Sequence, residues 1–317
     1  MPKFDLVHDI PNLAGKICLV TGGNSGLGEA TIAALAQHNP AKLYLGARSK
    51  TKAEAAVQRI KSSSPAAWSA NIEILEMDLA SFDSINAAAA RINNEASRLD
   101  LIHLNAGVAM IPATTTKDGY EVQFGTNFLG HALLTQLLIP KLLETAALHD
   151  TDVRVVSVSS AIHKVFIPKQ GIIFEELHTA MKSTGGPALY GQAMIAKILF
   201  TRQLAKRYPN IMFTSLHPGP VKSSVYSGTK DMNWFFLNCV LRPLVALRGV
   251  SIEEGSKTQL WCSFSMDVVN GSYYEPIGTT GKESDMSRDV QLASKLWDWT
   301  EKELLAKGAP GWPQAKA

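Results

Sequence analysis

Short apolar runs rich in β-branched residues alternate with helical patterns along the chain, and this alternation most constrains the fold. Six runs are predicted to be strands, and they occupy residues 16–23, 41–48, 72–79, 99–107, 153–160 and 212–219. Strands that alternate with helices need crossover connections, which produce a parallel sheet with helices on both faces. The sequence therefore predicts an α/β fold with a doubly wound parallel sheet in three α/β/α layers.

The length and composition are compatible with one such domain. The chain has 317 residues, 46% of them hydrophobic, and no linker or internal repeat divides it. We therefore predict a single domain over residues 1–317. Irregular regions at 162–188 and 222–255 follow the fifth and sixth strands, where an open α/β sheet builds its ligand cleft. The second region carries bulky apolar residues and is predicted to be an insertion that covers the substrate.

Charge and cysteine content narrow the classes of function. The net charge is +3 without a dense Lys/Arg run, so nothing indicates nucleic acid as a partner. Three scattered cysteines argue against a disulfide framework and a zinc site, and they favour a reducing, cytoplasmic setting.

No run reaches the roughly 20 apolar residues that a membrane-spanning helix needs. The most apolar segment, 234–250, is interrupted by Arg242 and Pro243. It favours a buried or substrate-covering helix pair over a membrane-surface patch.

A glycine-rich turn follows the first predicted strand and opens the first helix. Its sequence, VTGGNSGLGEA, spans residues 20–30 and has T-G-x-x-x-G-x-G spacing. Residues without Cβ let the backbone bend sharply and approach a ligand, and the helix start offers free N–H groups to a pyrophosphate. In this position the turn favours dinucleotide binding in a Rossmann-type domain over a bare turn. The candidate contacts are Gly22, Asn24, Ser25, Gly26, Leu27 and Gly28.

The end of the second strand addresses the choice of cofactor. Arg48 and Lys52 stand where an Asp or Glu would bind an adenosine ribose 2′-hydroxyl. Cations at this point suit a 2′-phosphate, so NADP(H) is favoured over NAD(H). The alternative is that Arg48 is a solvated loop cation.

The ends of the third and fourth strands add further candidate contacts. The third strand ends at Asp78 and Leu79. The Asp78 carboxylate would accept a hydrogen bond from the adenine amino group, cap the next helix, or do both. The fourth strand ends at Asn105, Ala106 and Gly107, where small residues let the chain pass close to a flat ligand.

These motifs, in this order and spacing, resemble the short-chain dehydrogenase/reductase family. The resemblance covers about residues 14–225 and is carried by TGGNSGLG, NAG, TNFLGHALLTQLL, VVSVSS, Tyr190 and HPGPVKSS. The segments HPG, GSYYEPIG and LWDWTE look most like the retinol-dehydrogenase-like and fungal secondary-metabolism branches. The family interconverts carbonyls and alcohols with a nicotinamide cofactor, so the resemblance implies an NADP-dependent oxidoreductase. Its members often dimerise or tetramerise, which implies a homo-oligomer.

The resemblance also implies an active site. The family uses an Asn-Ser-Tyr-Lys set, and Asn127, Ser160 and Tyr190 match its first three members. The family's lysine position holds Met194 instead. Each matched residue also has a purely structural reading, in a helix, a strand-end cap or a core. The cofactor loop after the sixth strand matches Pro218, Gly219, Val221 and Ser223, and Tyr190 is a cofactor contact as well.

The missing lysine affects the two directions of reaction differently. A free tyrosine has a pKa of about 10, and a nearby ammonium lowers that value. Alcohol oxidation needs Tyr190 as a base, whereas carbonyl reduction needs a phenol that already carries its proton. Met194 therefore penalises oxidation more than reduction, and we expect a reductase.

Lys197 lies seven residues after Tyr190, within roughly 20° of the same helix face. We expect it to lie too far along, near the outer end of the helix, to replace the lysine. In the alternative its side chain leans back toward the N-terminus and partly replaces it.

Together these features predict an NADP(H)-dependent reductase of a ketone or aldehyde of a lipophilic small molecule, in the style of secondary metabolism. The alternative is the same fold used for a non-redox step such as isomerisation, dehydration or cyclisation. Loss of catalysis in favour of binding is a third reading, favoured by Met194 and opposed by Asn127, Ser160 and Tyr190.

Overall fold

The described part of the chain is built on one parallel sheet. The computed structural model describes residues 3–221 and 249–314. Its seven-stranded sheet has the order β3-β2-β1-β4-β5-β6-β7, and every pairing is parallel. The strands are β1 (Ile17–Thr21), β2 (Lys42–Ala47), β3 (Ile72–Glu76), β4 (Leu101–Leu104), β5 (Arg154–Val158), β6 (Met212–Leu216) and β7 (Tyr273–Tyr274). The six predicted strands are confirmed, while β7 was not predicted.

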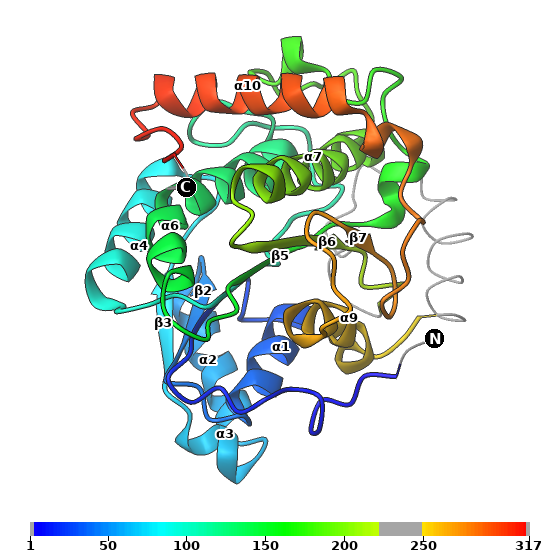
Figure 1. Cartoon of the computed structure of the whole chain (residues 1–317). Helices are drawn as coiled ribbons and strands as arrows, with labels where there is room; N and C mark the ends of the chain where they lie inside the picture. Colours follow the sequence, from blue (N-terminus) through cyan, green and yellow to red (C-terminus); the bar gives the residue numbers. More distant parts are fainter. Residues whose placement is uncertain (1–2, 222–248, 315–317) are drawn as a thin grey trace.

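Helices cover both faces of this sheet, as Figure 1 shows. One layer is formed by α1 (Gly26–Ala36), α2 (Lys50–Lys61) and α9 (Ile252–Phe264), with the short α3 (Pro65–Ser69) beside α2. The opposite layer contains α4 (Phe82–Glu95), α6 (Gly130–Ala146) and α7 (Gly186–Arg207), and α10 (Val290–Ala306) packs outside α7. The predicted doubly wound, three-layer α/β/α fold is therefore confirmed.

Short helices and turns connect these elements. The three-residue α5 (Val122–Phe124) leads into a π-helical turn, η1 (Gly125–Leu129), which continues directly into α6. The irregular region predicted at 162–188 contains two 3₁₀ turns, η2 (Ala161–Lys164) and η3 (Phe174–Glu176). A third, η6 (Asp285–Arg288), precedes α10.

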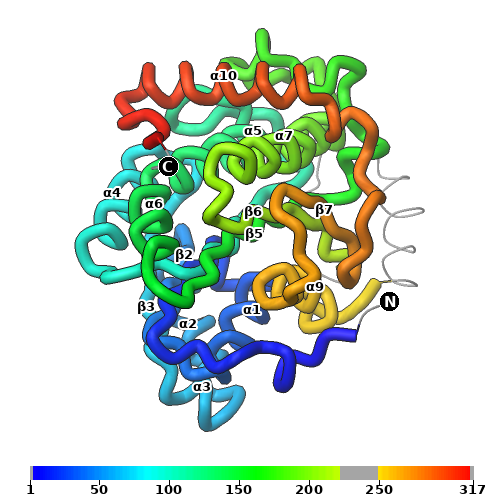
Figure 2. Tube along the Cα trace, viewed as in Figure 1, coloured from blue at the N-terminus to red at the C-terminus, as the bar shows by residue number. Residues whose placement is uncertain are grey.

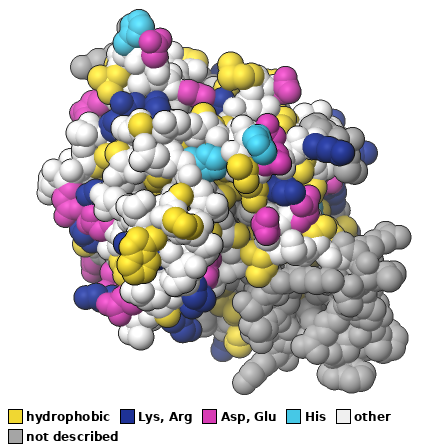
Figure 3. Space-filling model, turned by 90° about the horizontal axis from the view of Figure 1, so that it is seen from below, with side chains coloured by type: hydrophobic (Ala, Val, Ile, Leu, Met, Phe, Trp, Pro, Cys, Tyr) yellow, Lys and Arg dark blue, Asp and Glu magenta, His cyan; other side chains and the backbone are white. Residues whose placement is uncertain are grey.

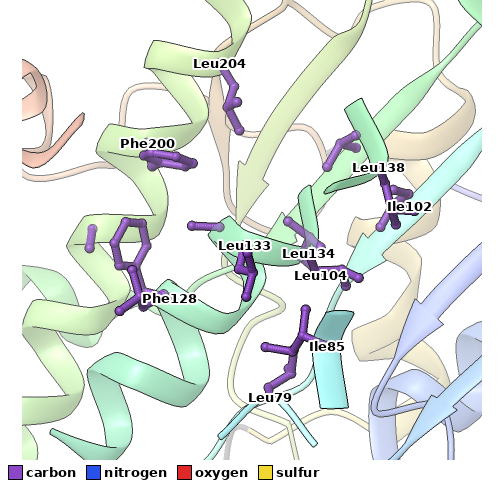
Figure 4. Packing of buried hydrophobic residues seen from close by; sticks show 14 of the residues in the cluster. Leu79, Ile85, Ile102, Leu104, Phe128, Leu133, Leu134, Leu138, Phe200 and Leu204 are labelled. Carbon is purple, nitrogen blue, oxygen red and sulfur yellow. The ribbon is translucent and has the colours of Figure 1, made fainter. Parts of the chain in front are cut away.

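The two helical layers bury separate hydrophobic cores against the sheet. Figure 4 shows the core beneath α4, α6 and α7, where Leu138 of α6 lies beside Ile102 of β4, and Ile85 of α4 lies beside Leu79. β1 is buried along its whole length, because both of its faces are covered. This explains why its sequence is a continuous apolar run rather than an alternating one.

The N-terminal segment closes the second core. Figure 2 shows the chain before β1 running past α1 and α9 on the outside of that layer. Phe4, Ile10 and Leu13 are buried against this core, and His38 Nε2 hydrogen-bonds Leu6 O at 2.8 Å. The segment therefore belongs to the domain rather than to a free tail.

Charged side chains are mixed on the surface, and the described helices differ from a bilayer-spanning helix in length or apolarity. In Figure 3, acidic and basic side chains are interspersed over the face shown. Within residues 3–221 and 249–314, no helix is both long and apolar enough to cross a bilayer. The insertion predicted around 222–255 lies mostly outside the described residues. Its described end contains a bridge between Val221 and Val250 and the first turn of α9.

Candidate functional site

A cleft opens at the carboxyl ends of the strands, where the chain order reverses between β1 and β4. Open α/β sheets bind ligands at this kind of switch point. The cleft has a volume of about 370 Å³. Of the sequence-predicted residues it is lined by Gly22, Asn24, Ser25, Gly26, Leu27, Arg48, Lys52, Asp78, Leu79, Asn105, Ala106, Gly107, Ser160, Tyr190, Pro218, Gly219 and Val221. The structure thus brings most of the candidate residues to one place.

The glycine-rich turn has the geometry that its sequence predicts. Gly22 has φ +68°, in the left-handed region that favours glycine. Gly28 lies outside the cleft lining, and a Cβ built there would overlap the carbonyl oxygen of Gly22. Gly22 therefore shapes the bend, while Gly28 allows α1 to pack closely under it.

The N-terminus of α1 faces this cleft. Ser25 is the N-cap residue, and its side chain makes no capping hydrogen bond. A Cβ built at Gly26, where φ is +55°, meets no atom within 4 Å, so the space above this turn is open. An open glycine surface in front of a helix N-terminus fits the pyrophosphate of a nicotinamide dinucleotide.

The end of β2 presents cations to the same cleft. Arg48 is exposed there, and Ser49 caps α2 by accepting a hydrogen bond from the Lys52 backbone N–H at 3.4 Å. The start of α2 thereby brings Lys52 alongside Arg48. Two cations at this position fit a 2′-phosphate better than a free ribose hydroxyl.

Asp78 does not cap the following helix, so that reading of its carboxylate is wrong. The N-cap residue of α4 is Ser81, whose hydroxyl accepts from the Ser84 backbone N–H. Asp78 Oδ1 accepts instead from the Ala80 N–H at 3.0 Å, two residues along the chain. This local turn holds Asp78 in the cleft lining, where the adenine reading stays a prediction.

The end of β4 is tied to β1 beneath the cleft. The Thr21 hydroxyl oxygen accepts from the backbone N–H groups of Asn105 and Ala106, both at 2.9 Å. The Asn105 amide nitrogen donates to Thr21 O at 2.9 Å. These bonds fix the small-residue segment as the floor of the cleft. Thr21 was not among the predicted residues, because a threonine at the end of a buried strand carries no distinctive signal.

Two of the three predicted catalytic side chains lie in the cleft. Ser160 follows β5, and its Oγ accepts from the Ile162 N–H at 3.3 Å, so it caps η2 as well. Tyr190 lies in the second turn of α7 and is partly buried. Met194, one turn further, is 3% exposed and also lines the cleft.

Asn127 is placed behind the cleft lining. Its Oδ1 accepts from the Val108 N–H at 2.7 Å, and its Nδ2 donates to Val108 O at 2.8 Å. This is the backbone-bonded reading that the sequence left open. The side chain connects the π-turn η1 to the segment that follows β4, and a Cβ built at Gly107 would lie only 3.1 Å from Asn127 Oδ1.

Lys197 lies in the middle of α7, so the expectation that it occupies the helix's outer end was wrong. Its side chain leans back, and Nζ donates to Leu104 O at 3.0 Å, at the end of β4. Lys197 lines the cleft together with Tyr190 and Met194. Burial lowers the pKa of its amino group to about 7.

His217, like Thr21, is a cleft residue to which the sequence analysis gave no role. It precedes the Pro218-Gly219 pair, lines the cleft, and has a buried Nδ1 without a hydrogen-bond partner among the described residues. Burial lowers its pKa to about 4, so the ring is neutral at pH 7. The HPG triplet was the only signal pointing to it. The predicted contact Ser223 lies outside the described residues.

Comparisons with known proteins agree with this geometry. The family model for short chain dehydrogenases matches residues 16–172. A short-chain dehydrogenase/reductase of Aspergillus calidoustus is 35% identical, over 93% of this chain and 95% of its own. Retinol dehydrogenase 14 of Mus musculus is 34% identical, over 90% of this chain and 85% of its own.

A solved structure supports the same relationship. An uncharacterised protein from Mycobacterium paratuberculosis superposes with a TM-score of 0.71 at 25% identity, covering 95% of this chain and 97% of its own. Identity above 30% over almost the whole chain, together with the shared fold, identifies the family. The chain belongs to the short-chain dehydrogenase/reductase family.

Proposed function

We propose that this oxidoreductase is an NADP(H)-dependent reductase of a ketone or aldehyde carried by a lipophilic small molecule. The observation that carries the proposal is the single cleft shared by the glycine-rich turn and the hydroxyls of Ser160 and Tyr190. Arg48 and Lys52 at the other end of that cleft support NADP(H).

Residues at the two ends of the cleft have different roles in the reaction: one end binds the cofactor, and the other acts on the carbonyl. The α1 N-terminus and Arg48 bind phosphate groups, while Asn105–Gly107 form the floor under the flat part of the cofactor. When bound, the reduced nicotinamide supplies the hydride. Tyr190 donates the proton that the carbonyl oxygen gains, and Ser160 donates a hydrogen bond to the same oxygen.

Met194 supports the direction of the reaction. It places an apolar side chain beside Tyr190 in the cleft lining. Low-polarity surroundings favour the neutral form of a phenol, which is the form that donates a proton. A reductase role follows, because oxidation would need the phenolate as a base.

The substrate class rests on sequence and on a relative. The apolar segment 234–250 falls in the predicted substrate-covering insertion. Retinol dehydrogenase 14 is named for retinol, a lipophilic alcohol. A role in secondary metabolism is proposed from the sequence motifs, and a cytoplasmic location from the scattered cysteines. A homo-oligomer is proposed by analogy with the family. The similarity to oxidoreductases and retinol dehydrogenases does not favour the non-redox alternative.

The test begins with titration of the purified protein with NADPH and NADH, followed by nicotinamide fluorescence. NADPH should bind more tightly and be consumed with a panel of lipophilic aldehydes and ketones. Tyr190→Phe should lower the reduction rate by about 10²–10⁴-fold, while NADPH affinity should fall far less, because the phenyl ring remains. Absence of NADPH binding, or product formation without NADPH consumption, would contradict the proposal.

A further inference from the structure

The amino group of Lys197 is buried without a carboxylate partner. The residue is 4% exposed, and no ion pair joins it to any residue in 3–221 or 249–314. A lysine ammonium has three donors. Here Leu104 O is its one acceptor at hydrogen-bonding distance with unambiguous geometry. A buried, unpaired cation is costly, so its position calls for an explanation other than stability.

The side chain of His131 of α6 lies within hydrogen-bonding distance of this amino group. His131 Nδ1 lies 2.9 Å from Asn127 O and 3.4 Å from Lys197 Nζ. The shorter contact assigns the ring proton to Nδ1, which donates to Asn127 O. Burial, with the nearby lysine charge, lowers the His131 pKa well below its usual range, so the ring is neutral.

The other ring nitrogen extends the network to the cleft floor. With the proton on Nδ1, Nε2 accepts from the Thr21 hydroxyl at 2.9 Å. Thr21 Oγ1 in turn accepts from the N–H groups of Asn105 and Ala106. The bonds around Lys197 and His131 therefore join α7, the π-turn η1 and the ends of β1 and β4.

Lys197 also lines two spaces. One is the cleft, and the other is a small pocket of about 20 Å³ lined by residues of β4, β5, β6, η1, α6 and α7. Figure 4 labels Leu104, Phe128, Phe200 and Leu204, which belong to that lining. This volume has room for about one water molecule, which would accept a second hydrogen bond from Nζ.

We propose that Lys197 is a positioning residue for carbonyl reduction, acting with His131 to fix the cleft floor and the Asn127 turn relative to Tyr190. This proposal rests on the proposed function. In it, Lys197 supplies from further along α7 the cation that the family has at position 194. The end of β4, the turn at Asn127 and the end of β1 all contact this pair, which lies on α7 and α6. A misplacement of about 1 Å between such groups is enough to cost a reaction roughly 10²-fold.

Because Lys197 can lose its proton, the reduction rate should depend on pH. The titratable groups that line the two spaces beside it are His131 on α6, Tyr190 on α7 and His217 after β6, with Arg48, Lys52 and Asp78 elsewhere in the cleft lining. β4 and β5 present Leu104 O and the neutral Ser157. Its amino group, with a pKa of about 7, loses its charge near neutral pH. We therefore expect reduction by the wild type to slow as pH rises through about 7, since the ammonium holds Leu104 O more strongly than the amine does.

The experiment compares Lys197→Met with the control Lys206→Met, an exposed lysine of the same helix. Turnover of NADPH with the best substrate of the wild type is measured from pH 6 to 9. Lys197→Met should lower kcat at pH 6.5 by about 10- to 100-fold and abolish the inflection near pH 7. Lys206→Met should keep the wild-type kcat and the inflection near pH 7. Lys197→Gln, which keeps a donor without a charge, should recover part of kcat without the inflection.

Hydrogen exchange supplies a readout that needs no turnover. Lys197→Met should speed exchange of the amides at 105–108 and 125–131, whereas Lys206→Met should not. An unchanged pH profile in Lys197→Met and Lys197→Gln, or unchanged exchange, overturns the proposal. If Lys197→Met does not fold, Lys197→Gln decides the matter by the same two measurements. A wild type that binds no NADPH contradicts the proposed function instead, and hydrogen exchange still decides the role of Lys197.

Discussion

Lys197 should make the protein's stability depend on pH, and Lys197→Met should remove that dependence. A lysine in the unfolded chain has a pKa of 10.5, whereas Lys197 in the folded protein has a pKa of about 7. Between these values the unfolded chain binds more protons, so stability rises with pH across this window. The lowered pKa of Lys197 reduces the free energy of unfolding by about 4 kcal/mol at pH 7. At pH 9 this reduction is smaller by about 2 kcal/mol.

The variant also loses the hydrogen bond to Leu104 O, which costs about 1–3 kcal/mol. Lys197→Met should therefore be more stable than the wild type at pH 7, by about 1–3 kcal/mol. Its advantage should shrink by about 2 kcal/mol at pH 9. Urea unfolding of the wild type, Lys197→Met and Lys206→Met at pH 6, 7, 8 and 9 measures this. A stability difference that does not change with pH, or a wild type more stable at pH 7, would refute the reasoning.

Three further changes test the packing of α7 and two other parts of the cleft. A Cβ at Gly191 would overlap Phe166 O, so Gly191→Ala should cost about 1–3 kcal/mol in urea unfolding, whereas Gly186→Ala, with its nearest contact at 3.7 Å, should cost nothing. Arg48→Ala should weaken NADPH binding about 10-fold while leaving NADH affinity unchanged in fluorescence titration, and equal losses would count against a 2′-phosphate contact. Met194→Lys should raise alcohol oxidation at pH 7 at least about 10-fold, and an unchanged rate would show that a cation at 194 does not limit oxidation.

The sheet and the cofactor end of the cleft could be predicted because their signals are local. A buried parallel strand is a continuous apolar run, and the turn at Gly22 needs residues without Cβ at fixed spacings within one short stretch of sequence. β7 could not be found this way. It has only two residues, Tyr273 and Tyr274, and its pairing with β6 depends on the folded sheet.

The catalytic end was harder to predict because it depends on side-chain partners from distant parts of the chain. Asn127 has the residue type that the family motif requires, but its amide is bonded on both sides to Val108. No local pattern indicated that Ser81, rather than Asp78, caps α4, since both have capping side chains. Such choices between equivalent local partners are made by tertiary packing.

Lys197 illustrates the same limit most clearly, and it changes how Met194 is understood. Helical geometry alone put the two Cα atoms of residues 190 and 197 about 10.5 Å apart along the axis, which suggested that the lysine was too distant. The side chain instead leans toward the N-terminus and reaches the end of β4. The site therefore keeps a cation beneath its floor while an apolar side chain lines the cleft beside Tyr190. Under the proposed function, an apolar side chain in place of a cation at position 194 suits proton donation to a carbonyl rather than proton removal from an alcohol.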